Sequence, residues 1–265
     1  MMSHTLIRPK GKGRPPTHPV DRLRTRIWFH VVKLRSGLPS AHAIEMKLDG
    51  ERIRNRDSDV NRPKKWESYR DGKKVPSDAP GPRNAIDQAE SWFPGTARWF
   101  RSPLWPVLRG EKQDRFSIEH ALRQLQPDVV NILFEPEPHE HETQSRPRSF
   151  DAECMERLFK LGSFDCLAAS VLWVALSEEI ASPGLRKTAL NLYFELQAIL
   201  KNQPEIQPFY PELFSCIDMR CKHWAYPLPN QRMDVVIFWH GYQEHLEKQK
   251  RAQDAQADDD PETGC

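Results

Sequence analysis

Apolar residues recur at helical spacing along most of this chain, and prolines separate the helical stretches. Between residues 19 and 37, for example, apolar side chains return every three or four positions. The chain holds 23 prolines, which end helices or stand between them. No stretch alternates apolar and polar residues over the length of a strand. The sequence therefore predicts an all-α fold built from short, sharply ended helices.

Charge is divided unevenly along the chain. Residues 1–115 hold 25 Lys and Arg against 13 Asp and Glu, whereas residues 116–265 hold 14 against 24. The resulting balances of +12 and −10 are typical of a polyanion-binding module joined to a part with another role. Attraction between the two halves is the alternative explanation of the same pattern.

Composition also bears on the compartment. The five cysteines are few and odd in number, and all lie in the C-terminal half, which is typical of reduced thiols in a cytosol. No apolar run approaches the roughly 20 residues that a membrane span needs. The N-terminus has no apolar core of signal-peptide length. We expect a cytoplasmic protein, nucleoid-associated in a bacterium, that has no membrane partner.

The stretch 61–76, NRPKKWESYRDGKKVP, predicts one short helix with both ends marked. Asn61 is a candidate N-cap, and Pro63 suits the first turn because its missing N–H costs nothing there. Gly72 stands where a left-handed C-cap belongs, and Pro76 prevents the helix from resuming.

The two faces of this predicted helix differ. At about 100° per residue, Trp66 and Tyr69 fall on one side, while Lys64 and Ser68 point the other way with Lys65 beside them. A helix this short needs neighbours to hold it. The pattern predicts an aromatic inner face and a cationic, hydrogen-bonding outer face of a size that a DNA major groove accepts.

The order of parts in the first third of the chain resembles the lambda-repressor-like (Xre-type) helix-turn-helix. The resemblance spans residues 19–95 and is carried by Leu34 to Leu38, Ser40 to Leu48, Trp66-Glu67 through Gly72 to Pro76, and Ile86 to Phe93. In that family the helix before the Trp-Glu signature is the recognition helix. The resemblance implies that Lys64, Lys65 and Ser68 face base edges or flanking phosphates. A purely structural helix is the alternative.

One departure from the family concerns the connection before this helix. The family joins its second and third helices by a tight turn, whereas about a dozen polar residues intervene here. Either this connection extends over the DNA backbone or the match is coincidental. Under the first hypothesis, five cations grip phosphates and position the domain: Arg52, Arg54, Arg56, Lys73 and Lys74.

A second, partial resemblance lies near the N-terminus. Lys12-Gly13-Arg14-Pro15 resembles the core of an AT-hook, with Lys12 in place of the first arginine. A thin basic arm without bulky side chains can follow a narrow minor groove, which makes Lys12 and Arg14 candidate DNA contacts. An ordinary solvated tail is the alternative reading.

These observations predict a domain organisation. We expect a disordered basic arm over 1–17, a helix-turn-helix-like domain over 18–112, an α-helical bundle domain for oligomerisation or partner binding over 116–250, and a disordered acidic tail over 251–265. The acidic, proline-rich segment 135–149 is expected to be an exposed loop within the bundle domain.

The sequence offers one constellation for metal binding. Cys216, Cys221 and His223 would supply three of the four ligands of a zinc ion, but the structural spacing C-x2-C is absent. His240 and His245 lie five apart on a predicted helix, about 140° round it, so they cannot both face one ion. We expect no metal and no cofactor, and we expect the two cysteines to be small core residues.

No catalytic motif is visible. The chain has no nucleophile elbow, phosphate-binding loop, dinucleotide fingerprint or HExxH. We therefore expect a non-enzyme, and the leading hypothesis is a sequence-specific double-stranded DNA-binding protein, a bacterial-type transcriptional regulator acting as a dimer or higher oligomer through its C-terminal helices. The alternative is a helical protein–protein adaptor whose basic N-terminal module binds an acidic partner.

Overall fold

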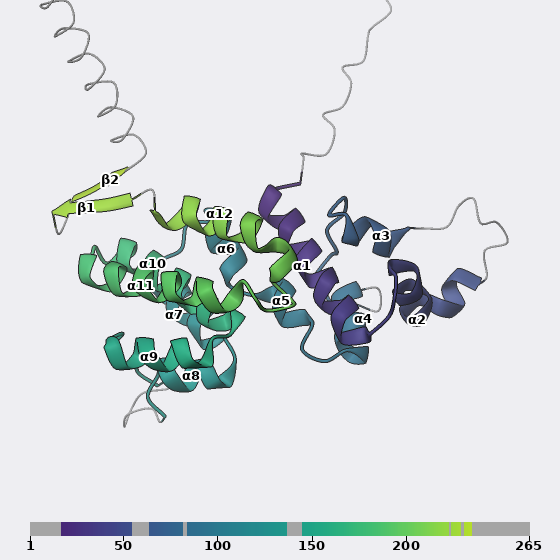
Figure 1. The fold of residues 1–265 in the computed structure, drawn as a ribbon, viewed down its shortest axis with the longest axis horizontal. Helices are drawn as coiled ribbons and strands as arrows, with labels where there is room; N and C mark the ends of the chain where they lie inside the picture. Colours follow the sequence, from purple (N-terminus) through teal and green to yellow (C-terminus); the bar gives the residue numbers. More distant parts are fainter. Residues whose placement is uncertain are drawn as a thin grey trace, which may run out of the picture. The chain divides into compact units, whose positions relative to one another are not determined.

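The computed structural model describes residues 17–54, 64–81, 84–136, 145–222, 224–228 and 231–234. Within these ranges the protein belongs to the all-α class, as predicted, with one short hairpin near the end of the described chain (Figure 1). The elements are α1 (Pro19–Ser36), α2 (Ala41–Arg54), α3 (Lys65–Arg70), α4 (Ala85–Trp92), α5 (Ala97–Arg101), α6 (Leu104–Leu108), α7 (Arg115–Arg123), α8 (Pro127–Leu133), α9 (Ala152–Leu161), α10 (Phe164–Glu179), α11 (Pro183–Leu200), η2 (Gln207–Phe209), α12 (Tyr210–Lys222), β1 (Trp224–Leu228) and β2 (Gln231–Asp234).

Contacts divide the chain into two compact units, one ending at Thr96 and the other beginning at Ala97. Helices α5 and α6 pack within the second unit. Trp99 of α5 stacks on Phe164 with ring centroids 4.4 Å apart. The indole N–H of Trp105 in α6 donates to the Trp99 carbonyl at 2.8 Å. The aromatic side chains of residues 97–108 are thus used in the core of the second unit.

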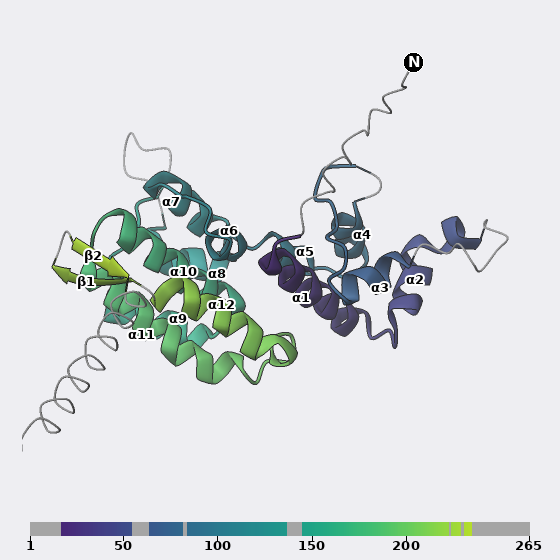
Figure 2. The same ribbon diagram turned by 90° about the horizontal axis from the view of Figure 1, so that it is seen from above.

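In the first unit, α1 contacts α2 and α3, and α2 also contacts α3 and α4 (Figure 2). Helix α1 ends where the sequence predicted, at Gly37, whose φ of 65° is the left-handed conformation of a C-cap. Helix α4 begins at Ala85. Asn84 caps it by accepting from the backbone N–H groups of Ile86 and Asp87.

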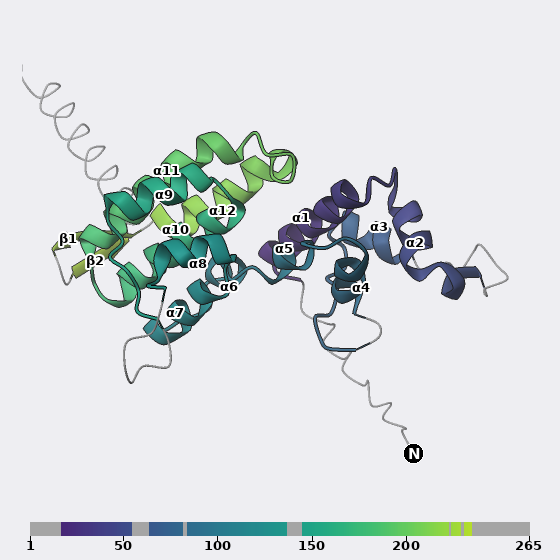
Figure 3. The same ribbon diagram turned by 90° about the horizontal axis from the view of Figure 1, so that it is seen from below.

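The second unit is arranged around α10. Every residue from 164 to 177 is buried, because α10 contacts α11, α7, α6 and α12 on its different sides (Figures 2 and 3). Ser163 caps this helix, its hydroxyl accepting from the Cys166 N–H at 3.3 Å. The nearby Asp165 carboxylate does not cap the helix and accepts from the backbone N–H of Gln126 at 2.8 Å.

The segment predicted as an exposed loop, 135–149, is paired at both flanks. Phe134 and Pro147 form an antiparallel bridge, the Glu135 N–H donates to the Arg146 carbonyl at 2.9 Å, and the Arg148 N–H donates to the Leu133 carbonyl at 2.8 Å. Residues 137–144 lie outside the described residues. The flanks are therefore held by backbone hydrogen bonds at the end of α8.

Strands β1 and β2 pair as an antiparallel hairpin (Figure 1). The sequence predicted no strands, so this short hairpin is a local exception within the all-α fold. Most of the predicted basic arm and all of the predicted acidic tail lie outside the described residues. Among the helices of the described ranges, none combines the length and the apolar character needed to cross a bilayer.

Candidate nucleic-acid interface

Helix α3 turns its two aromatic side chains inward, as the spacing predicted. Trp66 is 0% exposed and Tyr69 is 8% exposed. Trp66 stacks on Trp28 of α1 with ring centroids 5.7 Å apart, and Tyr69 meets Trp28 edge-on at 5.8 Å. Such aromatic pairs each contribute roughly 0.5–1.5 kcal/mol beyond the area they bury. This three-ring cluster anchors α3 to α1.

The start of α3 is held by two carboxylates of α2. The helix begins at Lys65, and Lys64 in the N-cap position makes no side-chain cap. Instead the Lys65 N–H donates to Glu45 Oε1 at 3.3 Å. Asn61, the predicted cap, lies outside the described residues. The free N–H of Lys65 is satisfied by an acceptor on a neighbouring helix.

Asp49 makes the second contact from α2. Its Oδ2 accepts from the indole N–H of Trp66 at 2.9 Å and lies 3.0 Å from Lys65 Nζ. The buried indole thus has the partner that a buried polar group needs. Burial and the nearby Asp49 charge raise the pKa of Tyr69 to about 12, which keeps its phenol neutral.

The end of α3 follows the prediction. Gly72 has a φ of 66°, and its N–H donates to the Tyr69 carbonyl at 3.1 Å. A Cβ at this position would lie 3.1 Å from the Arg26 side chain and 3.2 Å from the Arg22 carbonyl. Both the backbone conformation and the close approach to α1 therefore require glycine here.

The opposite side of α3 carries Ser68 between two exposed lysines. Lys64 and Lys74 are exposed and Ser68 is half-buried. The Ser68 hydroxyl donates to the Lys64 carbonyl at 2.8 Å, and the Lys74 N–H donates to the Ser68 carbonyl at 3.3 Å. This arrangement places both lysine backbones against the turn that contains Ser68.

The outer side is less cationic than the sequence predicted. Asp71 Oδ1 lies 2.8 Å from Arg70 Nε, and its Oδ2 lies 2.8 Å from Lys73 Nζ. These hydrogen bonds, that from Arg70 first, lower the pKa of Asp71 to about 2. Two of the exposed cations beside α3 therefore already have a carboxylate partner.

The structure brings together some of the predicted contact residues and leaves others apart. Lys64, Lys65 and Ser68 belong to α3 or its first turn, and Lys73 and Lys74 follow its end. Arg52 and Arg54 lie in the last turn of α2, which runs six residues past Leu48 and replaces the start of the predicted connection. Lys12, Arg14 and Arg56 lie outside the described residues.

Sequence reasoning missed Glu45 and Asp49, although a signal was available. The two carboxylates are four residues apart in α2, next to the buried Ile44 and Leu48. Glu45 itself is 1% exposed. Acidic residues at helical spacing along an apolar stripe indicate a polar partner on the facing element.

The candidate metal ligands lie in and after α12. Cys221 is buried, and burial raises the pKa of its thiol to about 12, so the thiol is protonated at neutral pH. Cys216 is half-buried, and its pKa is also raised by burial. His223, His240 and His245 lie outside the described residues. Within the residues that the structure describes, no three His, Cys, Asp or Glu side chains come together as metal ligands.

Comparison with protein-family models, with curated proteins and with solved structures found no match to this chain.

Proposed function

We propose that the first unit binds double-stranded DNA through the outer side of α3 and that the protein acts as a non-enzymatic transcriptional regulator. One observation carries the proposal. The aromatic side chains of α3 pack against α1, while Lys64 and Lys74 are exposed near Ser68 on the other side of the helix. A short helix whose buried face is anchored and whose exposed face carries cations fits a DNA major groove, which is about 12 Å wide.

The contacts sort into positioning and reading roles. Lys64 and Lys74 make no ion pair with any residue in the described ranges, so their ammonium groups are available for phosphates. The Ser68 hydroxyl donates to its own helix but can still accept from a base edge. Arg52 and Arg54 belong to the last turn of α2, before the connection to α3, and remain proposed phosphate contacts.

Lys65 takes a different role from the one its position suggested. Its ammonium pairs with Asp49 and its backbone N–H with Glu45, so it fixes the direction of α3. We therefore assign Lys65 as a positioning residue rather than a groove contact. A charge reversal at Lys65 would disturb the fold as well as any binding.

Useful specificity calls for two copies. A single short helix contacts few base pairs, so a dimer reading two half-sites is the expected form. Exposed apolar side chains on the second unit, Phe194 of α11 and Met219 of α12, are candidate dimer contacts at 47% and 72% exposure. Sedimentation of the full chain measures this part of the proposal.

The test is duplex DNA binding by the full chain, measured by fluorescence anisotropy at low salt. We expect Lys64→Glu to weaken binding roughly tenfold or more. The substitution removes an attraction to a phosphate and adds a negative charge that the phosphate repels. The matched control is Lys187→Glu, an exposed lysine of α11 in the second unit, which should bind as the wild type does. Asp71→Asn should strengthen binding by releasing Arg70 and Lys73.

The opposite results would remove the proposal. Equal binding by the wild type and Lys64→Glu would show that α3 does not face the duplex. Absence of DNA binding at low salt, together with a stable complex with an acidic protein, would favour the adaptor hypothesis instead.

A further inference from the structure

The turn that follows α3 lies against the N-terminal half of α1. Gly72 in this turn is buried, and a Cβ there would lie 3.2 Å from the Arg22 carbonyl and 3.1 Å from Arg26 Cδ. Arg22 and Arg26 are about one turn apart in α1, so they share one side of that helix. The surface around Gly72 is therefore built from two elements of the first unit, α1 and the end of α3 (Figure 2).

The two segments that meet at Gly72 are both basic. Residues 21–26 hold three arginines and one aspartate, and residues 70–74 hold one arginine, two lysines and one aspartate. Six cations thus stand against two carboxylates, a balance of +4. The start of α3 adds Lys64 and Glu67, one charge of each sign, which leaves that balance unchanged.

Both carboxylates of these segments already pair with cations. Asp21 Oδ1 lies 3.2 Å from Arg24 Nη2, within α1. The two carboxylate oxygens of Asp71 are taken by Arg70 and Lys73. The charge that is left over in the two segments is therefore positive.

Arg22 and Lys74 carry part of this remaining charge at the surface. Both residues are exposed, and neither side chain forms an ion pair or a hydrogen bond with a residue that the structure describes. Their backbones are fixed, since the Lys74 N–H donates to the Ser68 carbonyl at 3.3 Å and the Arg22 carbonyl lies against Gly72. One guanidinium and one ammonium group are thus available on adjoining elements.

We propose that Arg22 and Lys74 bind the phosphate backbone of the same duplex whose major groove α3 enters. The contact rests on the proposed DNA binding and extends the interface onto α1. A guanidinium presents paired N–H donors that match phosphate oxygens, and an ammonium adds a point charge. Phosphate contacts fix the orientation of a protein on the duplex. Because Trp66 stacks on Trp28, a phosphate contact through α1 also fixes the direction in which α3 meets the groove.

The experiment measures the affinity of the full chain for duplex DNA by fluorescence anisotropy over a series of salt concentrations. Arg22→Gln should reduce the slope of log affinity against log salt by about 0.9, because one phosphate contact is lost. The same loss should weaken binding roughly five- to tenfold at about 0.1 M salt. Arg22→Lys keeps the charge and should keep the slope. Arg22 is exposed, so both variants should fold, which circular dichroism verifies.

The matched control is Arg35→Gln. Arg35 is an exposed arginine in the last turn of the same helix, and its side chain also lacks an ion pair within the described ranges. It lies thirteen residues beyond Arg22, which is about 20 Å along the helix axis. The affinity and the salt slope of this variant should equal those of the wild type.

The outcomes separate this contact from the proposed function. An unchanged slope in Arg22→Gln, in a chain whose slope falls when Lys64 is replaced, would remove α1 from the interface and leave the role of α3 intact. Equal losses in Arg22→Gln and Arg35→Gln would overturn the contact too, because general surface charge would then attract the duplex. Absence of DNA binding by the wild type at low salt would remove the proposed function, and this contact with it.

Discussion

Helix α3 in the first unit and α10 in the second use their side chains in opposite ways. Every residue of α10 from 164 to 177 is buried, so this helix packs against other elements on all of its sides. Helix α3 has six residues, buries Trp66 and Tyr69, and leaves its other side exposed or half-exposed. Helix α10 therefore organises its unit, whereas α3 is positioned by its unit and leaves one side exposed or half-exposed.

The polar contacts of the two helices differ in the same way. In α10 the buried hydroxyls of Ser170 and Ser177 donate to carbonyls of their own helix, at 2.8 and 2.6 Å. In α3 the corresponding contacts reach Glu45 and Asp49 of another helix. Contacts within a helix satisfy buried groups, while contacts between helices also fix a direction. The direction of α3 thus depends on residues far away in the sequence.

The largest expected effect is at the aromatic anchor. Trp66→Ala should lower the free energy of unfolding of the first unit by about 3–5 kcal/mol, because a large, fully buried ring is removed. Urea unfolding with regional hydrogen exchange measures this change. The control Trp92→Ala removes a 52% exposed ring that contacts Lys47, and should cost about 1 kcal/mol or less. Equal effects would break the claim that α3 is anchored by its inner face.

A smaller effect is expected at the carboxylate that directs α3. Asp49→Ala should cost about 1–3 kcal/mol, because it leaves the buried indole N–H of Trp66 without its acceptor. Asp49→Asn keeps an oxygen for the indole and should retain part of that stability. Urea unfolding of the two variants separates the hydrogen bond from the charge facing Lys65. If both behave as the wild type does, the contact from α2 does not hold α3.

The next effect concerns the turn after α3. Gly72 and Gly37 both have φ near 65°, and an alanine in this conformation costs roughly 1–2 kcal/mol. A Cβ at Gly72 would also meet Arg26 and the Arg22 carbonyl, whereas a Cβ at Gly37 meets nothing within 4 Å. Gly72→Ala should therefore lower the unfolding midpoint in urea more than Gly37→Ala does. The reverse order would contradict the close packing of this turn on α1.

The smallest effect is a pH dependence that has opposite signs in the two units. Burial raises the pKa of Asp165 in α10, so its folded state holds a proton that the unfolded state releases near its ordinary value of 3.8. Stability from this group is present below that value and is lost as pH rises from about 4 toward the folded pKa. Asp165→Asn should remove this decrease in the free energy of unfolding, which urea unfolding at a series of acidic pH values measures. Asp71, whose pKa is lowered, contributes stability above 3.8 that is lost as pH falls toward about 2.

Much of the architecture was predictable because its causes are local. Proline and glycine mark the ends of α1, and helical spacing identifies Trp66 and Tyr69 as inward-facing. Gly72 was predictable for the same reason, since the left-handed conformation is a property of one residue and its turn.

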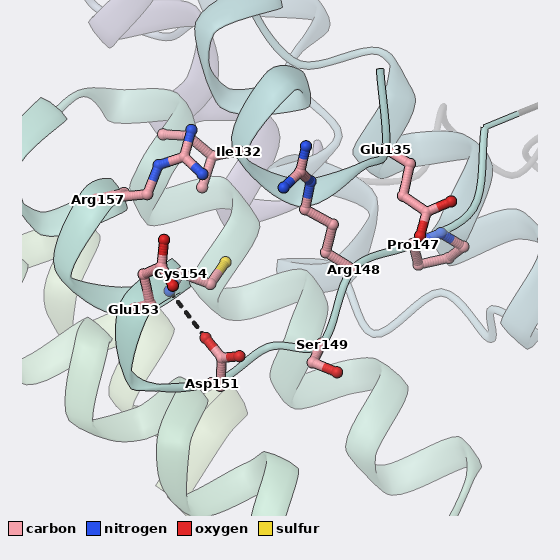
Figure 4. Close-up of a pocket in the computed structure, with 9 residues that line it drawn as sticks. All are labelled: Ile132, Glu135, Pro147, Arg148, Ser149, Asp151, Glu153, Cys154 and Arg157. Carbon is pink, nitrogen blue, oxygen red and sulfur yellow. Dashed lines mark hydrogen bonds between the residues drawn. The ribbon is translucent and has the colours of Figure 1, made fainter. Parts of the chain in front are cut away.

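What the sequence did not predict depends on distant partners. The cap of α3 comes from Glu45, twenty residues earlier, and the pairing of Lys65 with Asp49 spans sixteen. Ser163 and Asp165 are both good cap residues, and only the packing of α8 against α10 decides that Asp165 accepts from Gln126 instead. A surface hollow of about 330 Å³ is lined by residues of α8, of α9 and of the segment before α9 (Figure 4), so no single stretch indicates it.

The salt dependence of DNA affinity tests the central claim most directly. For the full chain, the logarithm of the binding constant should fall linearly with the logarithm of salt concentration, by a slope of about 0.9 for each phosphate neutralised. The double variant Lys64→Ala and Lys74→Ala should reduce that slope by about 0.9 for each contact it removes. A flat response in the wild type, or an unchanged slope in the double variant, would contradict the assignment of the outer side of α3 as a DNA-binding surface.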